Sequence, residues 1–150
     1  MFAKHYDQCL SGHFPRRESW GLSTDMLNHI SIGASSLSTA KVFYDATLSA
    51  LGYRCLSEDA GSLGYGSKTV EFWVLKSEKP APDEAASGLH ICFTAPTRES
   101  VDRFHGAGLQ HGGRDHGRPG PRPDYGPHYY AAFLKDPDGY RVEAYCCTTT

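Results

Sequence analysis

The residues of this chain whose types and spacing suit a chemical site are two histidines and two glutamates. His29 and His90 each open a strand-like segment, and Glu71 and Glu143 each lie in the last strand-like segment of their half of the chain. If the two halves pair symmetrically, these side chains supply two imidazole nitrogens and two carboxylate oxygens near one axis. Such donors suit Zn, Ni, Fe, Co or Mn. Since none of the four is a cysteine, a closed structural zinc site is not expected.

Each of these residues also has a plainer explanation. A single strand histidine is usually a surface or hydrogen-bonded residue, and the repetition of His29 as His90 is what favours a ligand role. Glu143 lies between apolar neighbours, where a buried carboxylate without a partner is costly, so a metal or another strong partner is expected. Glu71 has similar neighbours, although a salt bridge in a pocket would also explain it.

The elements that must position these residues follow from the periodicity of apolar side chains. In the first half, serines at 35–38 supply helix N-cap candidates and Gly52 stands where a helix would end. In the second half, Thr97 is a cap candidate and the Asp-Pro-Asp-Gly run at 136–139 predicts a turn. The predicted elements are strands at 27–33, 53–56, 63–65, 69–75, 89–95, 114–116, 129–135 and 140–146, and helices over 40–51 and from 97 to 112.

The order of these elements predicts an α+β fold of two paired βαβββ modules, at 27–75 and 89–146, which form a curved mixed sheet around a metal-binding cleft. Residues 76–88 are rich in Pro, Ala and charge and are expected to be a linker. Residues 1–25 show neither a helical nor a strand period and are expected to form an N-terminal extension that is disordered or packs peripherally. The Gly- and Pro-rich segment 117–127 is expected to be a loop.

Several aromatic and histidine residues are candidates for a substrate pocket. Alternation places Trp73 on the face of Glu71 and Tyr145 on the face of Glu143, although strand aromatics are as often plain core. The residues expected in the pocket are Trp73, His128, Tyr130 and Tyr145. The other histidines of the second half, His105, His111 and His116, are expected to be solvated.

Composition excludes some partners. The net charge of -2 and a pI near 6.4 give no basic surface for nucleic acid, and no apolar run is long enough to cross a membrane. Five cysteines without a CxxC spacing favour a reducing compartment, so the protein is expected in the cytoplasm. The expected partner is therefore a small-molecule substrate.

Four segments resemble the vicinal oxygen chelate superfamily of glyoxalases, bleomycin-resistance proteins and extradiol dioxygenases over residues 26–147. They are LNHISI, TVEFWVL, GLHICF and YYAAFLKDPDGYRVEAY, and the FW and YYAAF strands are typical of a glyoxalase-like branch. The resemblance implies paired βαβββ modules and His29, Glu71, His90 and Glu143 as ligands of zinc or nickel, with iron or manganese as other candidates. One glutamate, Glu143 or Glu71, would also be the catalytic base that moves a proton between adjacent carbons.

Three functions remain open on this basis. The first is a metal-dependent lyase or isomerase, similar to lactoylglutathione lyase, which acts on a small substrate chelated through neighbouring oxygens. The second is an iron-dependent dioxygenase, in which Glu71 would be dispensable. The third is a metal-free drug-binding protein of the bleomycin-resistance kind. A homodimer is expected, since two-module members of this superfamily commonly pair.

Overall fold

A computed structural model describes residues 26–80 and 88–147. The expected N-terminal extension, residues 1–25, and residues 81–87 of the expected linker lie outside the described residues. The elements are β1 (Ile30–Ala34), α1 (Leu37–Ser49), β2 (Arg54–Glu58), β3 (Ser62–Gly66), β4 (Phe72–Lys76), β5 (His90–Thr94), α2 (Arg98–Gln110), β6 (Arg114–Pro121), β7 (Tyr130–Lys135) and β8 (Arg141–Cys146).

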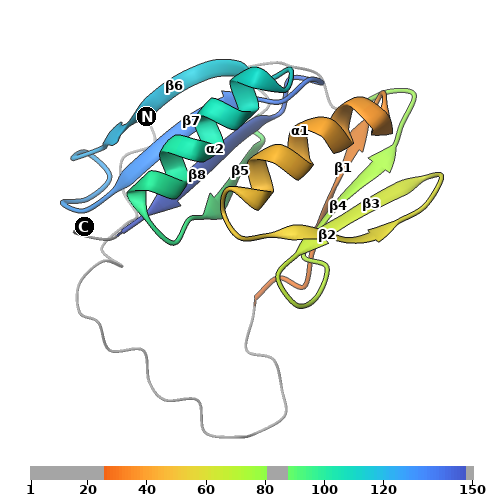
Figure 1. Ribbon diagram of the computed structural model, residues 1–150, viewed down its shortest axis with the longest axis horizontal. Coiled ribbons are helices and arrows are strands. Elements are labelled where there is room, and N and C mark those ends of the chain that lie inside the picture. Colours follow the sequence, from red (N-terminus) through yellow and green to blue (C-terminus); the bar gives the residue numbers. More distant parts are fainter. Residues whose placement is uncertain (1–25, 81–87, 148–150) are drawn as a thin grey trace, which may run out of the picture.

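The strands form two separate four-stranded mixed sheets with the same topology (Figure 1). The first sheet has the order β1-β4-β3-β2 and the second the order β5-β8-β7-β6. In both, the first strand of the module pairs in parallel with the last, and the remaining pairs are antiparallel. The predicted α+β fold of two βαβββ modules is therefore confirmed, and β1 and β5 each lie at an edge of their sheet.

Each helix covers one face of its own sheet, and the two helices lie side by side (Figure 1). Ser36 caps α1 by accepting from the backbone N–H of Thr39, and Thr97 with Ser100 forms a reciprocal capping box at the start of α2. No helix of the described residues is long and apolar enough to cross a membrane.

One continuous apolar core joins the two modules. The rings of Phe72 and Phe93, from different sheets, meet edge to face with centroids 5.3 Å apart. Tyr44 of α1 donates a hydrogen bond of 2.7 Å to the buried carboxylate of Asp136, which lies in the turn before β8. These contacts cross between modules, so the relative position of the two sheets is fixed by side chains rather than by a shared strand ladder.

Two expectations from the sequence need correction. The segment expected to be a loop from 117 onward is partly strand, because β6 continues to Pro121 as an edge strand along β7, where prolines do not interrupt an inner ladder. His105, expected to be solvated, is buried at 7 % exposure and its Nε2 lies 2.8 Å from the Asp115 carboxylate of β6.

Candidate metal centre

The open face of the second sheet carries His90, Glu143 and Tyr145. Strand register pairs Cys92 with Glu143 across β5 and β8, and Phe133 with Glu143 across β7 and β8, so their side chains share a face. The neighbours of Glu143 along β8 are buried on the opposite face, against α2. The alternation of β8 therefore turns a glutamate away from the helix and towards the open side.

Glu143 is the centre of this half of the site. Its side chain is only 3 % exposed, whereas that of His90 is 39 % exposed, and Nε2 of His90 lies 3.0 Å from Oε2 of Glu143. The other carboxylate oxygen, Oε1, accepts a 2.7 Å hydrogen bond from the hydroxyl of Tyr129. Burial of a carboxylate is costly unless such partners are present, and here each oxygen has one.

Aromatic rings surround this pair. The rings of Tyr129 and Tyr145 lie 4.0 Å apart between centroids, and Tyr125 meets Tyr129 edge to face at 5.3 Å. The ring centroids of Phe133 and His90 lie 6.2 Å apart. The guanidinium of Arg122, in the connection between β6 and β7, lies 5.4 Å from the centroid of the Phe133 ring. The donors thus lie in a largely apolar setting, which strengthens electrostatic interactions made there.

The thiol of Cys92 also lies beside the Glu143 carboxylate. Burial raises the pKa of this thiol, and the neighbouring carboxylate raises it further, because a thiolate would place a second negative charge beside the first. Cys92 therefore stays protonated at neutral pH. In that form it is a weak hydrogen-bond donor.

The open face of the first sheet carries the other two predicted ligands. His29 and Glu71 lie just before β1 and β4, next to each other, since the backbone N–H of Ile30 donates to the carbonyl of Glu71 over 3.0 Å. Both are exposed, and Nδ1 of His29 lies 2.7 Å from the amide oxygen of the adjacent Asn28. Trp73 follows on the same face and is partly buried.

The two half-sites do not converge within one chain. Among residues 26–80 and 88–147, no three His, Cys, Asp or Glu side chains form a group that could hold a metal ion. The surroundings of Tyr53 indicate where Glu71 lies. Burial raises the pKa of Tyr53, and the nearby charge of the Glu71 carboxylate raises it further. The Tyr53 hydroxyl in turn donates to the carbonyl of Thr94 at the end of β5. Glu71 is therefore near the junction of the modules without reaching Glu143.

The spacing of His90 and Glu143 fits a divalent cation. Two ligands about 2.1 Å from one ion and at a right angle to each other are about 3.0 Å apart. This is the separation of Nε2 of His90 and Oε2 of Glu143, and an imidazole with a carboxylate is a common donor pair for Zn, Ni, Fe and Mn. His90 and Glu143 on the second sheet thus fit half of a metal site.

The predicted pocket residues lie in different places. Tyr145 adjoins the Glu143 centre, and Trp73 lies on the other sheet. Tyr130 faces α2 instead of the open side: its hydroxyl donates to Asp102 over 2.9 Å and its ring lies under Arg98. His128 is exposed in the segment before β7.

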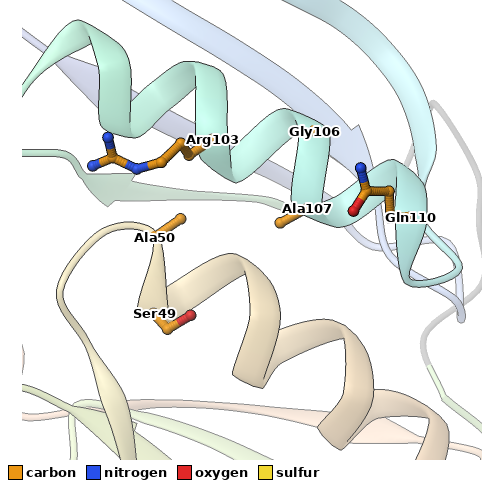
Figure 2. Close-up of a pocket in the computed structure, with 6 residues that line it drawn as sticks. All are labelled: Ser49, Ala50, Arg103, Gly106, Ala107 and Gln110. Carbon is orange, nitrogen blue, oxygen red and sulfur yellow. The ribbon is translucent and has the colours of Figure 1, made fainter.

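A crevice in the described residues lies elsewhere, between the C-terminal end of α1 and the second half of α2 (Figure 2). It has none of the predicted site residues in its wall. The lining residues are Ser49, Ala50, Arg103, Gly106, Ala107 and Gln110. It contains one charged side chain and no group of convergent donors, so we do not connect it with the candidate site.

Tyr129 and Cys92 are site residues that sequence reasoning missed. The period-2 pattern of β7 indicates Tyr129. Phe133 and Ala131 lie on the same face as their partners in β8, Glu143 and Tyr145. The next residue on that face, two positions before Ala131, is Tyr129 and not Tyr130. Cys92 follows from the same rule, two residues after His90.

Paired βαβββ modules with an open sheet face on each define a class of proteins, and comparisons with known proteins agree with this fold. Residues 26–144 match the family described as the Glyoxalase/Bleomycin resistance protein/Dioxygenase superfamily. No curated protein matches the sequence. The chain belongs to the glyoxalase/bleomycin resistance protein/dioxygenase superfamily.

Solved structures of this superfamily resemble the chain over most of its length. A glyoxalase/bleomycin resistance protein from Albidiferax ferrireducens T118 is 31 % identical, with a TM-score of 0.69, covering 81 % of this chain and 98 % of its own. A glyoxalase family protein from Enterococcus faecalis is 22 % identical, with a TM-score of 0.59 and coverages of 83 % and 100 %. The fosfomycin resistance protein FosX from Mesorhizobium loti shares the fold. It is 16 % identical, with a TM-score of 0.60, and the match covers 82 % of this chain and 92 % of FosX.

Proposed function

We propose that this protein is a divalent-metal-dependent lyase or isomerase that acts on a small substrate chelated through neighbouring oxygens. The observation that carries the proposal is the buried Glu143 carboxylate with Nε2 of His90 3.0 Å from one of its oxygens. The pair lies on a sheet face that neither α1 nor α2 covers. Zinc or nickel are the ions we favour for this donor set, with iron or manganese as further candidates.

We propose further that the complete site forms between two copies of the chain. In this arrangement His29 and Glu71 of one copy face His90 and Glu143 of the other, and a two-fold axis creates two such sites. The absence of a three-donor group within the described part of one chain supports this. The exposure of Leu75, on the open face of the first sheet, supports a surface that a second copy covers.

The bound ion would polarise the two substrate oxygens and so acidify a hydrogen on the carbon next to them. The chain's own residues would do the rest. A glutamate, Glu71 or Glu143, would take that proton and return it to the adjacent carbon, and the rings of Tyr145 and Tyr129 would limit the access of water.

The direct test is the metal content and mass of the purified protein. After loading with Zn, Ni, Co, Mn or Fe(II) in turn and desalting, we expect about one ion per chain in a dimer. Inductively coupled plasma mass spectrometry with light scattering gives both numbers. A protein that retains no ion under any of these conditions would contradict the proposal and favour a metal-free binding protein.

A second function is favoured by one observation. Glu71 is exposed and precedes β4, whereas Glu143 is buried, so a site of His29, His90 and Glu143 would match the two-His, one-carboxylate set of iron-dependent dioxygenases. Glu71→Ala separates the two. Retention of Fe(II) together with oxygen consumption in this variant would select the dioxygenase, and loss of the ion would select the four-ligand site.

A further inference from the structure

The hydroxyl of Tyr129 is a neutral side-chain oxygen placed against the Glu143 carboxylate. It donates to Oε1 over 2.7 Å, while Nε2 of His90 lies against Oε2. The two oxygens of the buried carboxylate are therefore distinguished by their partners. One faces the exposed histidine and the other faces a tyrosine that is only 7 % exposed.

Two neighbouring rings hold the Tyr129 ring in place. It stacks on Tyr145 at 4.0 Å and meets Tyr125 edge to face. Its backbone is fixed as well, since its N–H donates to the carbonyl of Gly126 and its carbonyl accepts from the N–H of Arg122. The hydroxyl of this fixed ring donates to Oε1 of Glu143.

We propose that Tyr129 is a positioning residue: it holds Oε1 of Glu143, so that Oε2 alone is presented, beside Nε2 of His90, to a divalent cation. This inference rests on the proposed metal site and assigns Tyr129 a role within it. Loss of a partner that orients a metal ligand commonly lowers the metal affinity by about 10- to 100-fold. Without the hydroxyl, Oε1 loses the hydrogen bond from Tyr129, and the orientation that places Oε2 beside His90 is held less firmly.

The test compares Tyr129→Phe with Tyr125→Phe in the full chain, by titration with Co(II) and by the visible absorption of the bound ion. Tyr129→Phe keeps the ring stacked on Tyr145 and removes only the donor to Glu143. We expect its Kd for Co(II) to rise about 10- to 100-fold, with an altered visible spectrum that reports a changed ligand geometry. The exposed Tyr125 is the matched control, and its variant should bind as the unaltered protein does.

Affinity and spectrum that are both unchanged in Tyr129→Phe would overturn the inference while leaving the metal site intact. If the unaltered protein takes up no cobalt, the proposed function itself has failed, which is a different result. A second measurement needs no variant that must fold: zinc added to the unaltered protein should shift the near-ultraviolet tyrosine absorption, because the ion withdraws charge from the acceptor of the Tyr129 hydrogen bond. A flat difference spectrum from protein that has bound zinc would also overturn the inference.

Discussion

His90→Ala is expected to weaken the binding of a divalent cation by at least about 100-fold. Loss of a residue that only hydrogen-bonds to a metal ligand already lowers the metal affinity by up to about 100-fold, and His90 is proposed as a ligand itself. The fold should persist, because the His90 side chain is 39 % exposed and takes no part in the core. The Glu143 carboxylate keeps its hydrogen bond from Tyr129 but loses the imidazole beside Oε2. Competition with a chromogenic chelator measures the affinity, and near-ultraviolet circular dichroism checks the packing.

The matched control is His111→Ala. His111 caps the end of α2, with Nδ1 2.8 Å from the carbonyl of Ala107, and lies on the helix side of the sheet. Its removal should leave the cation affinity unchanged. Equal affinity in His90→Ala and in the unaltered protein would show that His90 is not a ligand.

The second large effect concerns stability, at the point where both helices and β7 meet. A Cβ on Gly108 of α2 would lie 2.3 Å from Cδ1 of the buried Leu134 and 3.2 Å from Cγ2 of Thr47 in α1. Gly108→Ala is therefore expected to lower the free energy of unfolding by about 1–3 kcal/mol, even though alanine favours a helix. Urea denaturation followed by circular dichroism gives the value.

Gly106, in the same helix, supplies the control with the opposite sign. A Cβ there meets nothing within 4 Å, so Gly106→Ala should raise the free energy of unfolding by about 0.5–1 kcal/mol through helix propensity alone. Changes of the same sign in both variants would contradict the close packing of α2 on Leu134.

Local periodicity was sufficient to predict most of the fold. The alternation around Glu143 set its face correctly, and Ser36 and Thr97 occupy the predicted caps. What local pattern could not supply is the partner that a distant segment brings. His105 is buried because Asp115 of β6 comes to it, and β6 reaches Pro121 because β7 pairs with it.

The candidate site was predictable in part. Symmetry of the modules selected two His–Glu pairs; Nε2 of His90 lies 3.0 Å from Oε2 of Glu143, and the ligand roles of all four residues stay a prediction. Tyr130 was chosen where Tyr129 lies beside Glu143, an error of one residue that changes the face of a strand. The separation of the pairs on two sheets depends on the packing of α1 against α2, which the pattern of a single module does not contain.

The central claim is that each metal site takes one half from each of two chains, and complementation tests it most directly. His29→Ala and His90→Ala are each expected to lose the ion when expressed alone. In a mixed dimer, one site combines both alterations and the other combines the intact first half of one chain with the intact second half of the other. Co-expression with two different affinity tags isolates this mixed dimer.

We expect the mixed dimer to bind about one ion per two chains, or about a quarter of the full number of sites in an unsorted mixture. Mass spectrometry of metal content on the doubly purified dimer gives the number. Sites built within a chain would each keep one altered histidine, so a mixed dimer with no more metal than either single variant would contradict the account.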